Sequence, residues 1–135
     1  LMSYYATNAL GNVYYAMGDY RNAIMCYEEN VMAYNDNSLR LSMADCYLFL
    51  ADCDSMEQVL AEYLAEGGEE AEAASYRMKA AYHKGNYEEL LTYADMVIAN
   101  NNRDAKAKAY KAVAMRELGM EGADDLIADL EQALR

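Results

Sequence analysis

The residues whose side chains can do acid–base or nucleophilic chemistry are few and scattered along the sequence. His83 is the only histidine, and its neighbours Lys79 and Lys84 do not form a general-base arrangement with it. The cysteines stand at positions 26, 46 and 53 without the spacing of a zinc or redox motif. No glycine-rich phosphate loop is found either. We therefore expect no catalytic residue, no metal site and no cofactor, and we predict that the chain is not an enzyme.

Packing explains the cysteines and methionines better than chemistry does. An odd number of cysteines argues against a disulfide framework and favours a reducing compartment, so we expect a cytoplasmic protein. The three cysteines are expected in the core, and the ten methionines are expected to fill gaps between helices. No apolar run approaches the roughly 18 residues of a membrane span, and no signal peptide is recognisable. Because the sequence begins Leu1-Met2-Ser3, we expect a piece of a longer protein.

The charge is distributed unevenly along the chain. Of the formal net charge of −12, residues 1–72 carry −11, from 13 acidic and 2 basic residues. Such a chain repels nucleic acid and anionic lipid, so neither is an expected partner. The acidic half either keeps the protein soluble or selects a basic partner, and both explanations stay open.

The carboxylates between Glu66 and Glu72 are expected to stabilise the start of a helix, because a helix N-terminus carries partial positive charge. A later helix is basic and either docks an acidic partner or balances acidic neighbours; its basic residues are Lys106, Lys108, Lys111 and Arg116.

These side chains must be positioned by helices, because a helical pattern repeats through the sequence. Gly18-Asp19-Tyr20 recurs as Gly85-Asn86-Tyr87, Gly119 follows 34 residues after Gly85, and Ala51-Asp52 lies halfway between the first two. A period of 33–34 residues results, and apolar residues at spacings of three and four flank each turn. The expected helices span 4–17, 20–34, 38–51, 55–66, 70–84, 87–100, 104–118 and 123–134.

The first of these units resembles the tetratricopeptide motif almost throughout. Its matching signature residues are Leu10, Gly11, Tyr14, Gly18, Tyr20, Ala23 and Tyr27. The resemblance covers essentially the whole chain and is weakest in the second unit. There Ala51-Asp52-Cys53-Asp54 replaces the glycine turn, and we expect a short insertion before Val59. The motif's tryptophan is absent, and Asn35 and Asn102 stand in place of its proline.

The resemblance implies an all-α fold: a right-handed α-solenoid of about four helix-turn-helix repeats with eight helices. The repeats would span 4–37, 38–69, 70–103 and 104–135, in a single domain over residues 1–135. The first helix of each repeat would line a concave groove, and the face expected there also carries Lys106, Ala109 and Val113. Asn8 and Asn12 are expected to grip a peptide backbone, with Tyr15 and Tyr82 as flat anchors. The full set of predicted groove residues is Asn8, Asn12, Tyr15, Asp45, Phe49, Lys79, Tyr82, His83 and Arg116.

We predict from this resemblance an adaptor or scaffold that binds a protein or peptide in its groove. Capture of chaperone tails by a basic clamp is rejected, because Asn8, Glu72 and Tyr76 stand where the clamp needs basic residues. Two alternatives stay open. One is a regulatory repeat domain of a larger enzyme. The other is self-association into a homo-oligomer through an apolar face of the last helix, formed by Leu126, Ile127, Leu130 and Leu134.

Overall fold

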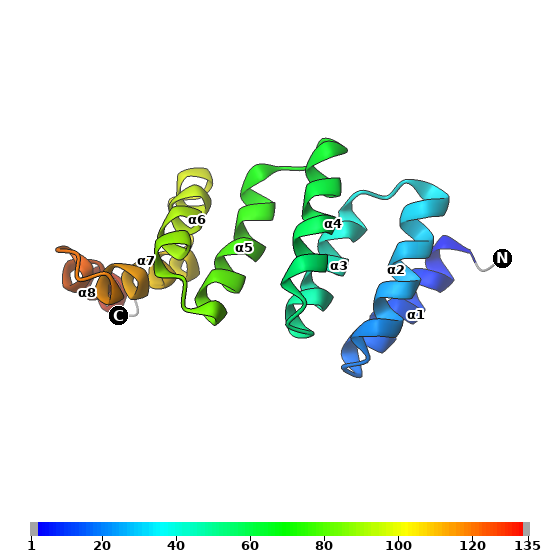
Figure 1. Cartoon of the computed structure of the whole chain (residues 1–135), viewed down its shortest axis with the longest axis horizontal. Coiled ribbons are helices and arrows are strands. Elements are labelled where there is room, and N and C mark those ends of the chain that lie inside the picture. The colour runs from blue at the N-terminus through cyan, green and yellow to red at the C-terminus, as the bar shows by residue number, and fades with distance from the viewer. Residues whose placement is uncertain (1–2, 134–135) are drawn as a thin grey trace. The chain divides into compact units, whose positions relative to one another are not determined.

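The computed structural model describes residues 3–133, which form eight α-helices and no strand (Figure 1). The helices are α1 (Tyr4–Ala16), α2 (Tyr20–Tyr34), α3 (Ser38–Phe49), α4 (Cys53–Ala65), α5 (Glu70–Lys84), α6 (Tyr87–Asn100), α7 (Ala105–Glu117) and α8 (Ala123–Ala133). Every predicted helix is present, and the ends agree within two residues. Leu134 lies outside the described residues. None of the helices between residues 3 and 133 is long and apolar enough to cross a bilayer.

The helices form two compact units, and the boundary between them falls in the first turn of α5. Unit 1 comprises residues 3–73 and unit 2 comprises residues 74–133. In unit 1, α2 packs on α1, α3 on α2, and α4 on α3; in unit 2, α7 packs on α6 and α8 on α7. Packing between sequence neighbours is what a stack of helical hairpins requires. The single domain and its right-handed solenoid stay predictions.

Three of the four hairpins turn on a glycine in the left-handed backbone conformation. Gly18 has φ of 78° and donates its N–H to the carbonyl of Tyr15, while the next residue, Asp19, donates to Tyr14. The same pair of bonds recurs at Gly85 and Gly119. These bonds satisfy carbonyl groups at the end of the first helix that would otherwise lack partners.

The second repeat makes the same turn without a glycine. Ala51 has φ of 57°, and the N–H of Asp52 donates to the carbonyl of Tyr47, as Asp19 does to Tyr14. The helix after the turn begins at Cys53, two residues beyond Ala51, just as α2 begins two residues beyond Gly18. The expected insertion before Val59 is therefore wrong: Ala51 occupies the glycine position, and the repeat keeps its length.

Small residues let the helices of each unit approach closely. At Gly11, a Cβ atom would lie 2.9 Å from Cε1 of Tyr27 and 3.1 Å from Cβ of Cys26, so α1 and α2 are in near-backbone contact. Asn30 is buried at the other end of this pair, and its Nδ2 donates to the carbonyl of Tyr4 at 3.0 Å. The core of unit 2 is rich in alanine and consists of Ala74, Met78, Ala81, Leu90, Ala94, Val97, Ala107 and Ala114.

The sulfur-containing residues follow the packing prediction only in part. Cys46 is fully buried, and burial raises the pKa of its thiol to about 12, while Cys26 and Cys53 are half-buried. The expectation that methionines fill gaps is wrong for several of them. Met17, Met25 and Met32 are 72%, 65% and 81% exposed, because they lie on helix faces that no neighbouring helix covers.

Candidate functional site

In unit 1, aromatic rings and a carboxylate gather where α1, α2 and α3 end and begin. The hydroxyl of Tyr15 on α1 donates to Oδ2 of Asp45 on α3 at 2.5 Å. Phe49 at the end of α3 stacks on Tyr20 at the start of α2, with centroids 4.7 Å apart and planes 3° from parallel. Tyr15 meets both rings edge-on, with centroids 5.6 Å from Tyr20 and 6.1 Å from Phe49. The structure therefore brings Tyr15, Asp45 and Phe49 together with Tyr20, while the binding role of the three predicted residues stays a prediction.

The hydroxyl of Tyr15 is engaged in a hydrogen bond within the protein. The hydrogen bond to Asp45, followed by burial, raises the pKa of Tyr15 well above its usual range, so the hydroxyl keeps its proton as a donor. This bond fixes the ring of Tyr15 and leaves Phe49, which is 58% exposed, as the ring that faces solvent. Tyr15 is placed to orient this aromatic group, and Phe49 offers the open contact area.

The carbonyl oxygens of the two predicted amide side chains on α1 are not open to a ligand. Asn12 accepts a hydrogen bond through Oδ1 from the hydroxyl of Tyr27 at 2.7 Å. Asn8 is half-buried, and its Oδ1 is buried without a hydrogen-bond partner. Neither carbonyl oxygen therefore faces a ligand. Asn8 and Asn12 were expected both to donate to and to accept from a peptide backbone. With their carbonyl oxygens not open to a ligand, only their Nδ2 groups can contribute, as donors.

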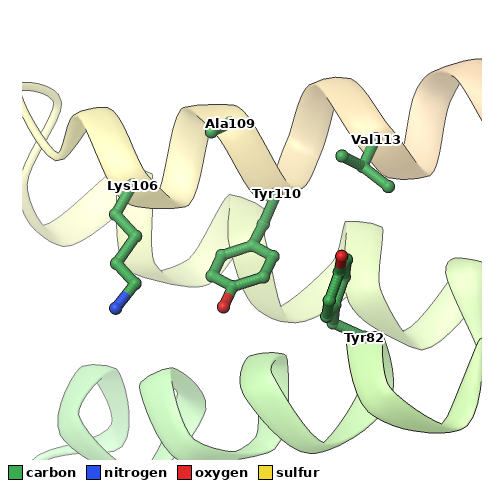
Figure 2. A pocket seen from close by; sticks show the side chains of 5 residues that line it. All are labelled: Tyr82, Lys106, Ala109, Tyr110 and Val113. Atoms are coloured by element: carbon green, nitrogen blue, oxygen red, sulfur yellow. The ribbon is translucent and has the colours of Figure 1, made fainter.

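Unit 2 contains a pocket between its first helices, α5 and α7 (Figure 2). Its volume is about 220 Å³, and its lining residues are Tyr82, Lys106, Ala109, Tyr110 and Val113. Figure 2 shows the rings of Tyr82 and Tyr110 extending between the two helices, with Val113 beside Tyr82. The two rings meet edge-on at 5.1 Å, and Tyr82 is 42% exposed. The pocket is thus an aromatic and aliphatic hollow with one ammonium group, from Lys106, among its lining residues.

The other predicted residues of unit 2 stand on the same two helices, α5 and α7, and do not line this hollow. His83 is exposed, and its ring packs edge-on against Tyr82 at 5.5 Å. The ammonium of Lys79, also on α5, lies 5.3 Å from the ring centroid of Tyr76, a cation–π distance. Arg116 on α7 is exposed and lies 3.8 Å from a carboxylate oxygen of Asp124 on α8. This weak surface pair leaves most of the guanidinium accessible.

Sequence reasoning missed two aromatic residues, one in each unit. Tyr20 matches the repeat motif, and the motif carries no signal that its ring stacks on Phe49. Tyr110 follows Lys106 by four positions and precedes Val113 by three, a spacing that places all three on one helix face. That spacing was the available signal for Tyr110.

A second, polar hollow lies in unit 1 between α2, α3 and α4. Its volume is about 120 Å³, and it is lined by Glu28, Met43, Tyr47, Ser55, Gln58, Val59 and Glu62. Burial, together with the charges of Glu28, Asp52 and Glu62, raises the pKa of Tyr47. Two carboxylates at one small hollow make it a negatively charged part of an already acidic unit.

Comparisons with known proteins identify the fold. The chain matches no protein-family model and no curated protein. Among solved structures, it is similar to the first TPR domain of Spaghetti (RPAP3) bound to an HSP90 peptide, with a TM-score of 0.74 and 21% identity, over 86% of this chain and 95% of that one. A variant of MamA matches with a TM-score of 0.72 and 19% identity, over 98% of this chain and 77% of that one. The first TPR domain of human RPAP3 matches with a TM-score of 0.69 and 21% identity, over 96% of this chain and 95% of that one.

Proposed function

Because the chain has the tetratricopeptide-repeat fold, we propose that it is a protein-interaction module without catalysis of its own. Its first helices bind a peptide or a partner helix, and unit 2 supplies the anchoring pocket. The observation that carries this proposal is the hollow between α5 and α7, with two tyrosine rings, Val113 and Ala109 in its wall. Aromatic side chains in partly open hollows are the usual anchors of protein interfaces.

The size of the pocket favours a protein ligand over a small molecule. Small-molecule sites typically measure roughly 300–1,000 Å³ and enclose most of their ligand. A pocket of about 220 Å³ is smaller than that range and holds one bulky apolar side chain. The rest of the bound peptide then lies along the surfaces of α5 and α7, where the peptide's own backbone groups stay in contact with water.

The charges around the pocket select among such segments. Lys106 lines the hollow, and Lys79 and Arg116 stand on the same two helices, so an apolar side chain next to an acidic residue fits best. Spaghetti's domain offers a precedent, because it is bound to an HSP90 peptide. The present chain lacks the basic clamp residues expected for chaperone tails, so its ligand is an internal acidic segment.

Unit 1 prefers the opposite charge. Residues 1–72 carry a net charge of −11, and the hollow lined by Glu28 and Glu62 adds to the negative potential of this unit. A segment that contacts unit 1, through Phe49 or beside this hollow, is therefore basic. The unpaired cysteines support a reducing location such as the cytoplasm.

Selection of peptides from a random display library on the whole chain tests the proposal. The variant Ala109→Phe fills the pocket from an exposed position on α7, and Ala99→Phe makes the same change at an exposed position on α6. Selected peptides should bind Ala99→Phe as they bind the unchanged chain and lose at least about tenfold in affinity, roughly 1.4 kcal/mol, towards Ala109→Phe. Equal binding of the peptides to both variants would show that they do not bind in this pocket.

A further inference from the structure

The carboxylate of Asp45 on α3 has no cationic partner among residues 3–73. Its Oδ2 atom accepts a hydrogen bond from the hydroxyl of Tyr15 at 2.5 Å. Neither of the two basic residues in this part of the chain pairs with it: Arg40 lies 3.9 Å from Glu62, and Arg21 forms no ion pair with a described residue. Asp45 is only half-buried, and its Oδ1 atom, which has no partner among the described residues, is in contact with solvent. This oxygen is free to accept a hydrogen bond from a ligand.

Phe49 presents an open aromatic ring one helical turn after Asp45. Residues four apart on a helix are neighbours, with roughly 5–6 Å between their Cβ atoms. Tyr20 stacks on the Phe49 ring at 4.7 Å, and Tyr15 meets it edge-on at 6.1 Å. Phe49 is nevertheless 58% exposed, so these contacts hold the ring in place and leave much of it open to solvent beside the carboxylate.

The packing of the repeats requires neither of these two side chains. Phe49 stands two residues before Ala51, the turn residue of its repeat, and Asp45 stands six residues before it. Two residues before the turn glycines of the other repeats stand Ala16, His83 and Glu117. Six residues before the same glycines stand Asn12, Lys79 and Val113. A carboxylate and a phenyl ring one turn apart therefore occur here only in the second repeat, which favours a role other than stacking the repeats.

We propose that Asp45 and Phe49 form a binding site for an arginine side chain of a protein partner. A guanidinium group is planar and weakly hydrated, so it stacks on the open ring of Phe49 while its N–H groups donate to Oδ1 of Asp45. A lysine ammonium makes the same ion pair, but it is compact and strongly hydrated and gains less from the ring. Tyr15 and Tyr20 are positioning residues, because they hold the carboxylate and the ring in place.

The charge of unit 1 favours such a ligand. Residues 1–72 carry a net charge of −11, so they attract a basic segment and repel an acidic one. The inference rests on the proposed function in one respect, since it names the side chain through which a basic segment contacts unit 1. It uses no residue that lines the α5–α7 pocket, so binding at either place can fail without the other.

Two peptides of equal charge test the site. Hexa-arginine and hexa-lysine with blocked ends are each titrated into the whole chain at low ionic strength. Attraction to the acidic unit acts on both peptides alike, so a difference in affinity reports the chemistry of the side chain. The unchanged chain should bind hexa-arginine at least about threefold more tightly than hexa-lysine. Nuclear magnetic resonance should show saturable shifts of the Phe49 ring and of Asp45 with hexa-arginine.

Two variants each remove one half of the site. Phe49→Leu keeps an apolar side chain without an aromatic ring and should bind the two peptides equally. Tyr34→Leu removes another ring of unit 1, which is 55% exposed, and should keep the preference for hexa-arginine. Asp45→Asn keeps an acceptor for the hydroxyl of Tyr15 without the charge. It should weaken hexa-arginine binding at least about twofold more than Glu29→Gln, which removes an exposed carboxylate from α2.

Three results would overturn the proposal. The first is equal binding of both peptides to the unchanged chain. The second is a preference for hexa-arginine that persists in Phe49→Leu, and the third is equal weakening by Asp45→Asn and Glu29→Gln. Circular dichroism should show the same helix content in all variants, so that these comparisons are made between folded proteins. None of the three results bears on the α5–α7 pocket, which the Ala109→Phe variant tests separately.

Discussion

At the scale of single residues, Ala51 shows most clearly how the fold outweighs local preference. Its backbone adopts the left-handed conformation that Gly18, Gly85 and Gly119 adopt in the other repeats. A residue with a Cβ atom pays about 1–2 kcal/mol for this conformation. Because no glycine stands at this turn, the sequence pattern suggested an insertion. The structure shows no insertion: Ala51 takes the glycine position in a strained backbone conformation.

Replacing Ala51 by glycine should therefore stabilise the protein. Ala51→Gly is expected to raise the free energy of unfolding by about 1 kcal/mol, since the strain exceeds the added entropy of the unfolded chain. Ala61→Gly, the same change at an exposed position inside α4, should lower the free energy by about 1 kcal/mol. Urea titration measures both variants. If Ala51→Gly were no more stable than the unchanged chain, the backbone conformation of Ala51 would not be destabilising.

Asp52, next to this alanine, should make stability depend on pH. Its carboxylate accepts hydrogen bonds from the hydroxyl of Ser55 at 2.7 Å and the N–H of Ser55 at 3.1 Å, which lower its pKa. A lowered pKa means that the carboxylate stabilises the fold above its unfolded pKa of about 4 and loses this effect as pH falls through the folded value. Asp52→Asn keeps an N-cap acceptor, as Asn86 does before α6, but does not titrate.

Denaturation of Asp52→Asn and the unchanged chain at a series of pH values checks this effect. The advantage of the aspartate should be largest at neutral pH and should shrink as pH falls below about 4. Other titrating groups are common to both proteins, so the difference isolates Asp52. A difference that stays constant from pH 7 to pH 2 would show that the charge of the cap does not matter.

At the scale of helices, periodicity predicted the elements well because each helix carries its own signals. Capping residues stand at Asp19, Asp52 and Asn86, and each side chain accepts from the N–H three residues later. Which side chains meet across helices was harder to predict. The bond from Tyr15 to Asp45 and the stack of Phe49 on Tyr20 join residues about 30 positions apart, and their geometry depends on how two hairpins pack.

The close approach of α1 and α2 predicts a large effect of a small change. Gly11→Ala is expected to destabilise the protein by about 1–3 kcal/mol, because the added methyl group would lie 2.9 Å from the ring of Tyr27. The Tyr27→Leu background removes the ring edge, so the same substitution should cost less there. Chemical denaturation of the four proteins gives the coupling between the two positions. Equal costs in both backgrounds would show that the glycine is not needed for this contact.

At the scale of the whole molecule, the sequence predicted a repeat protein and a set of residues on the first helices. Of these, Tyr15, Asp45 and Phe49 come together in unit 1, and Tyr82 joins the pocket of unit 2. The carbonyl oxygen of Asn12 accepts a hydrogen bond within unit 1, and that of Asn8 is buried without a hydrogen-bond partner, so neither is open to a ligand. Helical registers fix which face a side chain is on, and only packing decides whether it is free to bind.

The proposed binding depends on the pocket of unit 2, and one measurement tests this most directly. An isotopically labelled chain is titrated with a peptide selected on it, and the backbone and side-chain resonances are followed by nuclear magnetic resonance. Binding at this pocket should give saturable shifts centred on Tyr82, Ala109, Tyr110 and Val113. Shifts confined to the second helices α6 and α8, with these four residues unmoved, would contradict it.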